Sequence, residues 1–117
     1  MLFITDDAQS ATVTEIIHYW DVDSLGDLGD ADEYLSYARY EDQVFEAIHA
    51  AYPDAKLVVT QHNTSDCGYT RVSTADDSGQ SNSYWGCDHS PVGEALANVL
   101  EITGRIWESG DWLVEVQ

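Results

Sequence analysis

The chain has 117 residues, about the size of one domain, and 44% of them are hydrophobic. Its 22 acidic side chains stand against four basic ones, which gives a formal net charge of −18. A field of that sign repels nucleic acid, anionic membranes and nucleotides, and it attracts basic proteins. Thirteen aromatic residues support a folded core rather than a disordered acidic tail.

The first 20 residues predict two strands. Residues 2–4 are apolar and are typical of a short strand. Residues 11–20 carry conflicting signals. Their β-branched and aromatic side chains favour a strand. The spacing of Val13, Ile16 and Trp20 favours a helix instead. We expect a strand that pairs with residues 2–4.

An acidic loop and a helix follow. Residues 21–29 contain acids and glycines, which are typical of a loop. Asp30 is a suitable N-cap with Glu33 in the first turn, and Pro53 ends the helical pattern, so we expect a helix over 31–52. The apolar positions that set this helical spacing are 34, 37, 38, 44, 45, 48, 51 and 52.

The second half of the chain predicts four elements: a strand, a hairpin, a helix and a closing strand. Residues 56–61 are typical of a buried strand. Residues 68–74 and 81–87 are expected to form the arms of a hairpin, joined by the polar loop 75–80. Further on, residues 112–116 predict a closing strand.

Ser90 and Pro91 open the second helix as its cap and first residue, and Gly110 ends it. Its expected inner face consists of Val92, Leu96, Val99, Leu100, Thr103 and Ile106. The sequence therefore predicts one α+β domain over residues 1–117, with an antiparallel sheet of about four to six strands and two main helices packed on one face.

The acids are distributed unevenly along the chain. Residues 1–54 carry a net charge of −12 and residues 55–117 carry −6, and only Arg39 opposes the nine acids between positions 21 and 46. A surface adapted to high salt should spread its acids more evenly, so the cluster favours a binding face. The predicted partner-binding residues are Asp21, Asp23, Asp27, Asp30, Asp32, Glu33, Tyr37, Tyr40, Glu41, Asp42 and Glu46. An exposed tyrosine beside carboxylates suits a partner's arginines.

In its size, its α+β pattern, its few bases and this acid cluster, the chain resembles the small DNA-mimic inhibitors of phages and mobile elements, the anti-CRISPR and anti-restriction proteins. No sequence motif supports the likeness. The resemblance implies that the acids stand in for phosphates on a CRISPR effector, a restriction enzyme or a similar basic nucleic-acid-binding protein. It implies no catalytic residue, no cofactor and no direct binding to nucleic acid.

Two cysteines and two histidines, His62, Cys67, Cys87 and His89, form a weak candidate zinc set, because their spacing departs from the usual ligand patterns. A simpler account of Cys67 and Cys87 is that they are reduced packing residues, which base rates favour over both a disulfide and a metal site. The acidic loop lacks the register of an EF-hand calcium site.

No catalytic motif supports an enzyme, and acids next to both cysteines oppose an activated thiolate. No apolar run is long enough to span a bilayer, and residues 1–7 do not form a secretory signal, so we expect a cytoplasmic protein. The leading functional expectation is a non-enzymatic inhibitor that mimics DNA. The alternatives are a salt-adapted acidic interaction domain without a nucleic-acid-linked target, or a small metal-binding module.

Overall fold

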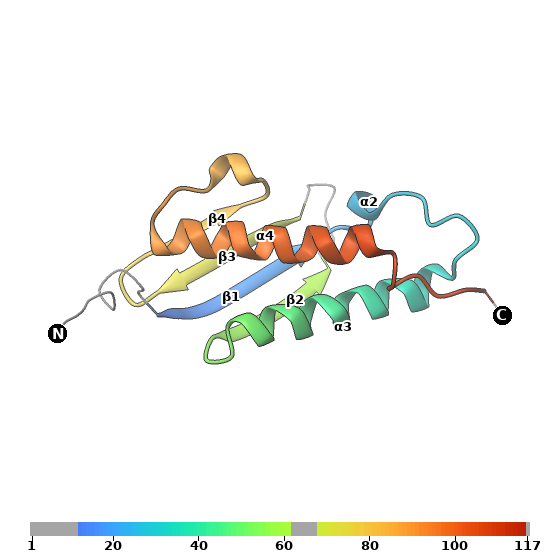
Figure 1. Ribbon diagram of the computed structural model, residues 1–117, viewed down its shortest axis with the longest axis horizontal. Helices are drawn as coiled ribbons and strands as arrows, with labels where there is room; N and C mark the ends of the chain where they lie inside the picture. The colour runs from blue at the N-terminus through green and yellow to red at the C-terminus, as the bar shows by residue number, and fades with distance from the viewer. Residues whose placement is uncertain (1–11, 62–67, 117) are drawn as a thin grey trace.

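The computed structural model describes residues 12–61 and 68–116, which form one four-stranded sheet and two long helices (Figure 1). The strands are β1 (Val13–Trp20), β2 (Lys56–Gln61), β3 (Tyr69–Thr74) and β4 (Ser78–Ser81), and they lie in the order β2-β1-β3-β4. The predicted α+β class is confirmed. The prediction of a strand rather than a helix before residue 21 is confirmed as well.

The sheet is mixed, whereas the sequence predicted a purely antiparallel one. β1 runs parallel to β2, with Ile16 opposite Leu57 and His18 opposite Val59. The pairs β1–β3 and β3–β4 are antiparallel. Parallel neighbours need a long crossover connection, and here the connection contains the helix α3 (Glu33–Ala51).

Capping side chains set the starts of both long helices. The Asp32 carboxylate accepts a hydrogen bond from the Leu35 amide at 2.9 Å, so Asp32 is the N-cap of α3. The prediction of Asp30 as the cap is therefore wrong. Ser90 caps α4 (Pro91–Ser109) by accepting from the Gly93 amide at 3.0 Å. Two short helices, α2 (Val22–Leu25) and the 3-10 turn η1 (Tyr84–Gly86), lie in the connections. No helix in the described part of the chain is long and apolar enough to cross a membrane.

The buried face of α3 differs from the predicted one. Its buried residues recur every four positions, at Ser36, Tyr40, Val44 and Ile48. Tyr34, Ala38 and Phe45, which contributed to the predicted apolar spacing, are exposed. A buried serine is accommodated because its hydroxyl accepts a hydrogen bond from the Val114 amide at 2.9 Å.

Both long helices cover the same face of the sheet, with α3 over β2 and α4 mainly over β3 and β4 (Figure 1). The expected inner face of α4 is largely correct, because Val92, Leu96, Val99 and Thr103 are buried. The core between the layers is built from Ile16, Trp20, Leu25, Tyr40, Val44, Ile48, Val72, Val92, Ala95, Leu96, Val99 and Trp112.

Two predicted strands are wrong. The second hairpin arm is β4 at 78–81, and the chain then turns into η1 instead of continuing as a strand to residue 87. Residues 112–116 form no strand either; they lie beside the start of α3, where the Asp32 amide donates to the Val114 carbonyl at 2.8 Å and Ala31 bridges Glu115. The expected strand at 2–4 lies outside the described residues.

Candidate functional site

The outward side of α3 carries acids in a row. The positions opposite the buried series are 34, 38, 42 and 46, which place Tyr34, Asp42 and Glu46 on one exposed stripe. Asp42 and Glu46 lie one turn apart, about 6 Å along the axis. Tyr34 has 81% of its surface exposed, so among the tyrosines of α3 it is the one available to a partner.

A second acidic stripe runs along α4. Glu94, Glu101 and Glu108 are all exposed and recur every seven residues, which places them on one side of the helix about 10.5 Å apart. Arg105 forms an ion pair with Glu101 on this stripe. The sequence reasoning missed these three residues, although their seven-residue spacing was visible. The two stripes together, Tyr34, Asp42, Glu46, Glu94, Glu101 and Glu108, are called the acidic helical layer below.

Several of the predicted partner-binding residues have internal roles instead. Asp21 is 8% exposed and Tyr40 is 4% exposed, so neither lies on the outer surface of the domain, and both line the internal cavity described below. Tyr37 is half-buried, with its ring 5.8 Å from that of Trp20. Half-buried Glu41 accepts a hydrogen bond from the Trp20 indole at 2.8 Å.

The acids before α3 are divided in the same way. Asp32 is occupied as the helix cap, and exposed Asp27 accepts from the Gly29 amide at 2.8 Å. Asp30 and Glu33 are exposed. Of the predicted set, Asp27, Asp30, Glu33, Asp42 and Glu46 are exposed acids, and the side chain of Asp23 lies outside the described part of the structure.

The other face of the sheet differs in charge from the helical layer. Strand alternation places exposed Lys56 and Arg71 there, with half-buried Glu15 as the single acid among the described strand residues on that face. Tyr19 and Tyr69 pack against each other on this face, with ring centroids 4.8 Å apart. Two of the four basic residues therefore lie on the side of the sheet that faces away from the helices.

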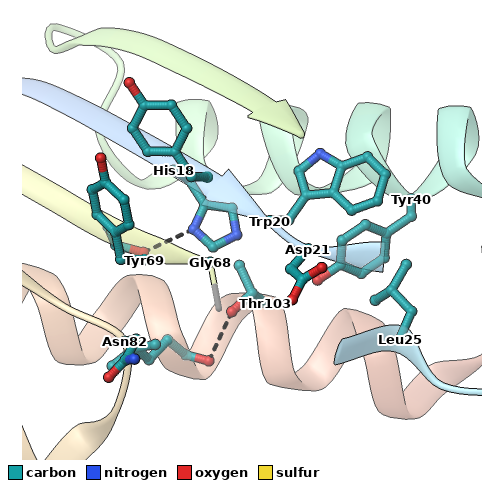
Figure 2. A pocket seen from close by; sticks show the side chains of 12 residues that line it. His18, Trp20, Asp21, Leu25, Tyr40, Gly68, Tyr69, Asn82 and Thr103 are labelled. Atoms are coloured by element: carbon teal, nitrogen blue, oxygen red, sulfur yellow. Dashed lines mark hydrogen bonds between the residues drawn. The ribbon is translucent and has the colours of Figure 1, made fainter. Parts of the chain in front are cut away.

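A half-open cavity of about 140 Å³ lies between the sheet and the helices, at the end of β1 (Figure 2). Residues from β1, α2, α3, β3 and α4 contribute to its lining. In Figure 2 the rings of Trp20 and Tyr40 lie at one end, with Asp21 beside them, whereas the ring of Tyr69 points away from His18.

His18 is the unusual member of this cavity. It is 6% exposed, and its Nδ1 lies 2.8 Å from the Thr70 hydroxyl, as marked in Figure 2. Burial lowers the pKa of the imidazole from 6.5 to about 4, so the ring is neutral at pH 7. Its Nε2 is buried and has no hydrogen-bond partner among the described residues. The sequence analysis overlooked His18, although a histidine on the inward side of an apolar strand was a visible signal.

The described residues provide no group of three or more side chains suited to a metal ion. Of the weak zinc candidates, Cys87 is half-buried and His89 is exposed, whereas His62 and Cys67 lie outside the described residues. Exposed Asp88, which separates Cys87 from His89, accepts hydrogen bonds from Ser90, and these lower the pKa of its carboxyl. The Asp88 carboxylate therefore holds Ser90, the N-cap residue of α4, in place.

Comparisons of the chain with models of protein families, with curated proteins and with solved structures find no match.

Proposed function

We propose that this domain is a non-enzymatic inhibitor that presents its acidic helical layer to a basic, nucleic-acid-binding site of another protein. The observation that supports this function best is the separation of charge between the two sides of the sheet. Exposed acids follow the outward stripes of both long helices, which also carry Arg39 and Arg105. The strand residues of the opposite face carry Lys56, Arg71 and a single, half-buried acid, Glu15. Acids that served solubility alone would be expected on both sides of the sheet in similar numbers.

The mechanism is occupation of the partner's groove. Proteins hold DNA through lysine and arginine contacts to phosphates, with release of condensed counterions. Carboxylates on two neighbouring helices provide such a partner with anchored negative charge, and the exposed ring of Tyr34 adds apolar and cation–π contact at one end of the α3 stripe. Association is then fast at low salt and weakens as salt rises. A CRISPR effector or a restriction enzyme in the host cytoplasm is the kind of partner proposed.

The test reverses charge on the proposed face and compares it with an equal change elsewhere. The double variant Asp42→Lys/Glu46→Lys alters the outward stripe of α3, whose two positions are exposed and have no structural hydrogen bond described. The control variant Asp54→Lys/Asp76→Lys makes the same change of net charge in two exposed turns outside the helices. Asp32 is left intact because it caps α3.

Each tagged protein is incubated with nuclease-treated bacterial lysate at low and moderate salt, and retained proteins are identified by mass. We expect wild type and control to retain a DNA- or RNA-binding protein that added duplex DNA displaces, and the α3 variant to lose it. Equal retention by both variants, or a retained protein without a nucleic-acid site, would refute the proposal.

The second candidate, a salt-adapted interaction domain, is favoured by the total charge of −18 and by exposed acids outside the helices, such as Asp54 and Asp76. Its acids would need screening for the fold to persist. The response of the domain's stability to salt therefore separates the two candidates.

A further inference from the structure

We propose that the cavity beside His18 binds a guanidinium group, the end of an arginine side chain that the partner presents. Naming a partner's arginine as the source of that group rests on the proposed function. The binding of guanidinium itself depends only on the cavity.

Three polar side chains of the cavity lining can accept hydrogen bonds. His18 directs an unpartnered, buried Nε2 into it. The Thr103 hydroxyl donates to the Leu100 carbonyl at 3.1 Å, so its oxygen lone pairs stay available. The buried Asp21 carboxylate also lines the cavity and carries interactions within the protein, and a carboxylate has about four acceptor positions.

His18 becomes an acceptor through its neighbour. The imidazole is neutral at pH 7 because burial lowers its pKa to about 4. When the ring proton is on Nδ1, it is donated to the Thr70 hydroxyl 2.8 Å away, and Nε2 is left with a lone pair. A ligand rich in donors stabilises this tautomer. Guanidinium has five N–H donors, a fixed charge and no acceptor.

The walls and the charge of the cavity favour a flat cation. Trp20 and Tyr40 supply aromatic surface, and the Trp20 ring is held in place by its hydrogen bond to Glu41. Aromatic faces attract cations, and planar guanidinium stacks on them more readily than ammonium does. No lysine or arginine is among the described residues that line the cavity, so nothing basic there competes with an incoming cation.

The volume also fits. A cavity of roughly 150 Å³ can hold benzene, whereas about 10–15 Å³ on the same measure is enough for one water. At about 140 Å³, the His18 cavity is large enough for the five heavy atoms of methylguanidinium and larger than one water requires.

The test titrates the uniformly ¹⁵N-labelled full chain with methylguanidinium chloride and follows the imidazole nitrogens of His18 and the indole of Trp20 by NMR. Methylammonium chloride and sodium chloride at equal ionic strength are the controls. We expect saturable shifts with methylguanidinium only, and a His18 Nε2 resonance typical of a lone-pair acceptor. Asp21→Asn should weaken binding at least tenfold, whereas Glu46→Gln, which removes one charge from the exposed α3 stripe, should leave it unchanged.

Shifts that rise linearly, or that are the same for all three salts, would overturn the inference and leave a cavity that holds water. The comparison of the three salts uses the wild-type chain, so it decides the matter even where Asp21→Asn fails to fold. Saturable binding without any basic partner in the lysate experiment would support the guanidinium site, assign it to a small free ligand and refute the proposed function. A partner that binds while methylguanidinium does not would refute the cavity alone.

Discussion

The buried His18 predicts that the domain loses stability as pH falls from about 6.5 to about 4. In the unfolded chain the imidazole has its ordinary pKa of 6.5, whereas burial lowers it to about 4 in the folded protein. Between these values the unfolded state binds the proton and the folded state does not, so protonation favours unfolding. The stabilising contribution of neutral His18 is complete above pH 6.5 and is lost as pH falls toward 4.

The size of the effect follows from the two pKa values. One pKa unit corresponds to about 1.4 kcal/mol, so the shift from 6.5 to about 4 corresponds to about 3 kcal/mol of unfolding free energy. The ring is buried, so solvent screening reduces this figure little. The free energy of unfolding of a small domain is about 5–15 kcal/mol in total, so the expected loss is easy to measure.

Urea unfolding at fixed ionic strength, at pH values from 7.5 to 4, measures the effect in wild type and in His18→Gln. Glutamine keeps a polar group near Thr70 but does not titrate, so subtracting the two curves removes the contribution of the many carboxylates. We expect wild type to lose about 3 kcal/mol more than the variant across this range. A difference that is independent of pH, or an NMR titration of His18 with a midpoint near 6.5, would refute the reasoning.

Two further predictions concern packing and salt. At Gly68, an added Cβ would overlap the Tyr19 carbonyl oxygen at the end of β1. Gly68→Ala should therefore lower the unfolding free energy, measured by urea titration, by about 1–3 kcal/mol. The control is Gly104→Ala, because a Cβ at that position meets no other atom. The far-ultraviolet circular dichroism at 10 mM salt should be that of the folded domain, with added salt raising the melting temperature modestly; unfolding at low salt would instead support the salt-adapted domain.

Local signals in the sequence predicted the helices well. Ser90 and Pro91 mark the start of α4 because a cap and a preset φ act within a few residues. The end of α3 beside Pro53 follows from the same kind of short-range constraint. These features depend on near neighbours in the chain, so they are readable without a structure.

Features that depend on distant segments could not be predicted in this way. Ser36 can be buried because the Val114 amide, far along the chain, donates a hydrogen bond to its hydroxyl. The hydrophobic pattern included Tyr34 and Phe45 in the apolar face because it counts only apolar side chains and so leaves out a buried serine. The parallel pairing of β1 and β2 had a signal that was not used, since a helix between two strands favours a parallel crossover.

The acid cluster shows why sequence clustering defines an interface only in part. Among the nine acids between positions 21 and 46, Asp21 is buried beside the cavity, Asp32 caps a helix and Glu41 accepts from an indole. We expect neutralisation of these three acids to perturb the fold or the cavity. Neutralisation of Asp42 or Glu46 should change only the electrostatic potential at the outer surface of α3. The two kinds of acid therefore serve different steps in the proposed function. Under the proposals made above, the exposed stripes would attract a basic partner over a distance, and the buried Asp21 carboxylate would help to select the cation that enters the cavity.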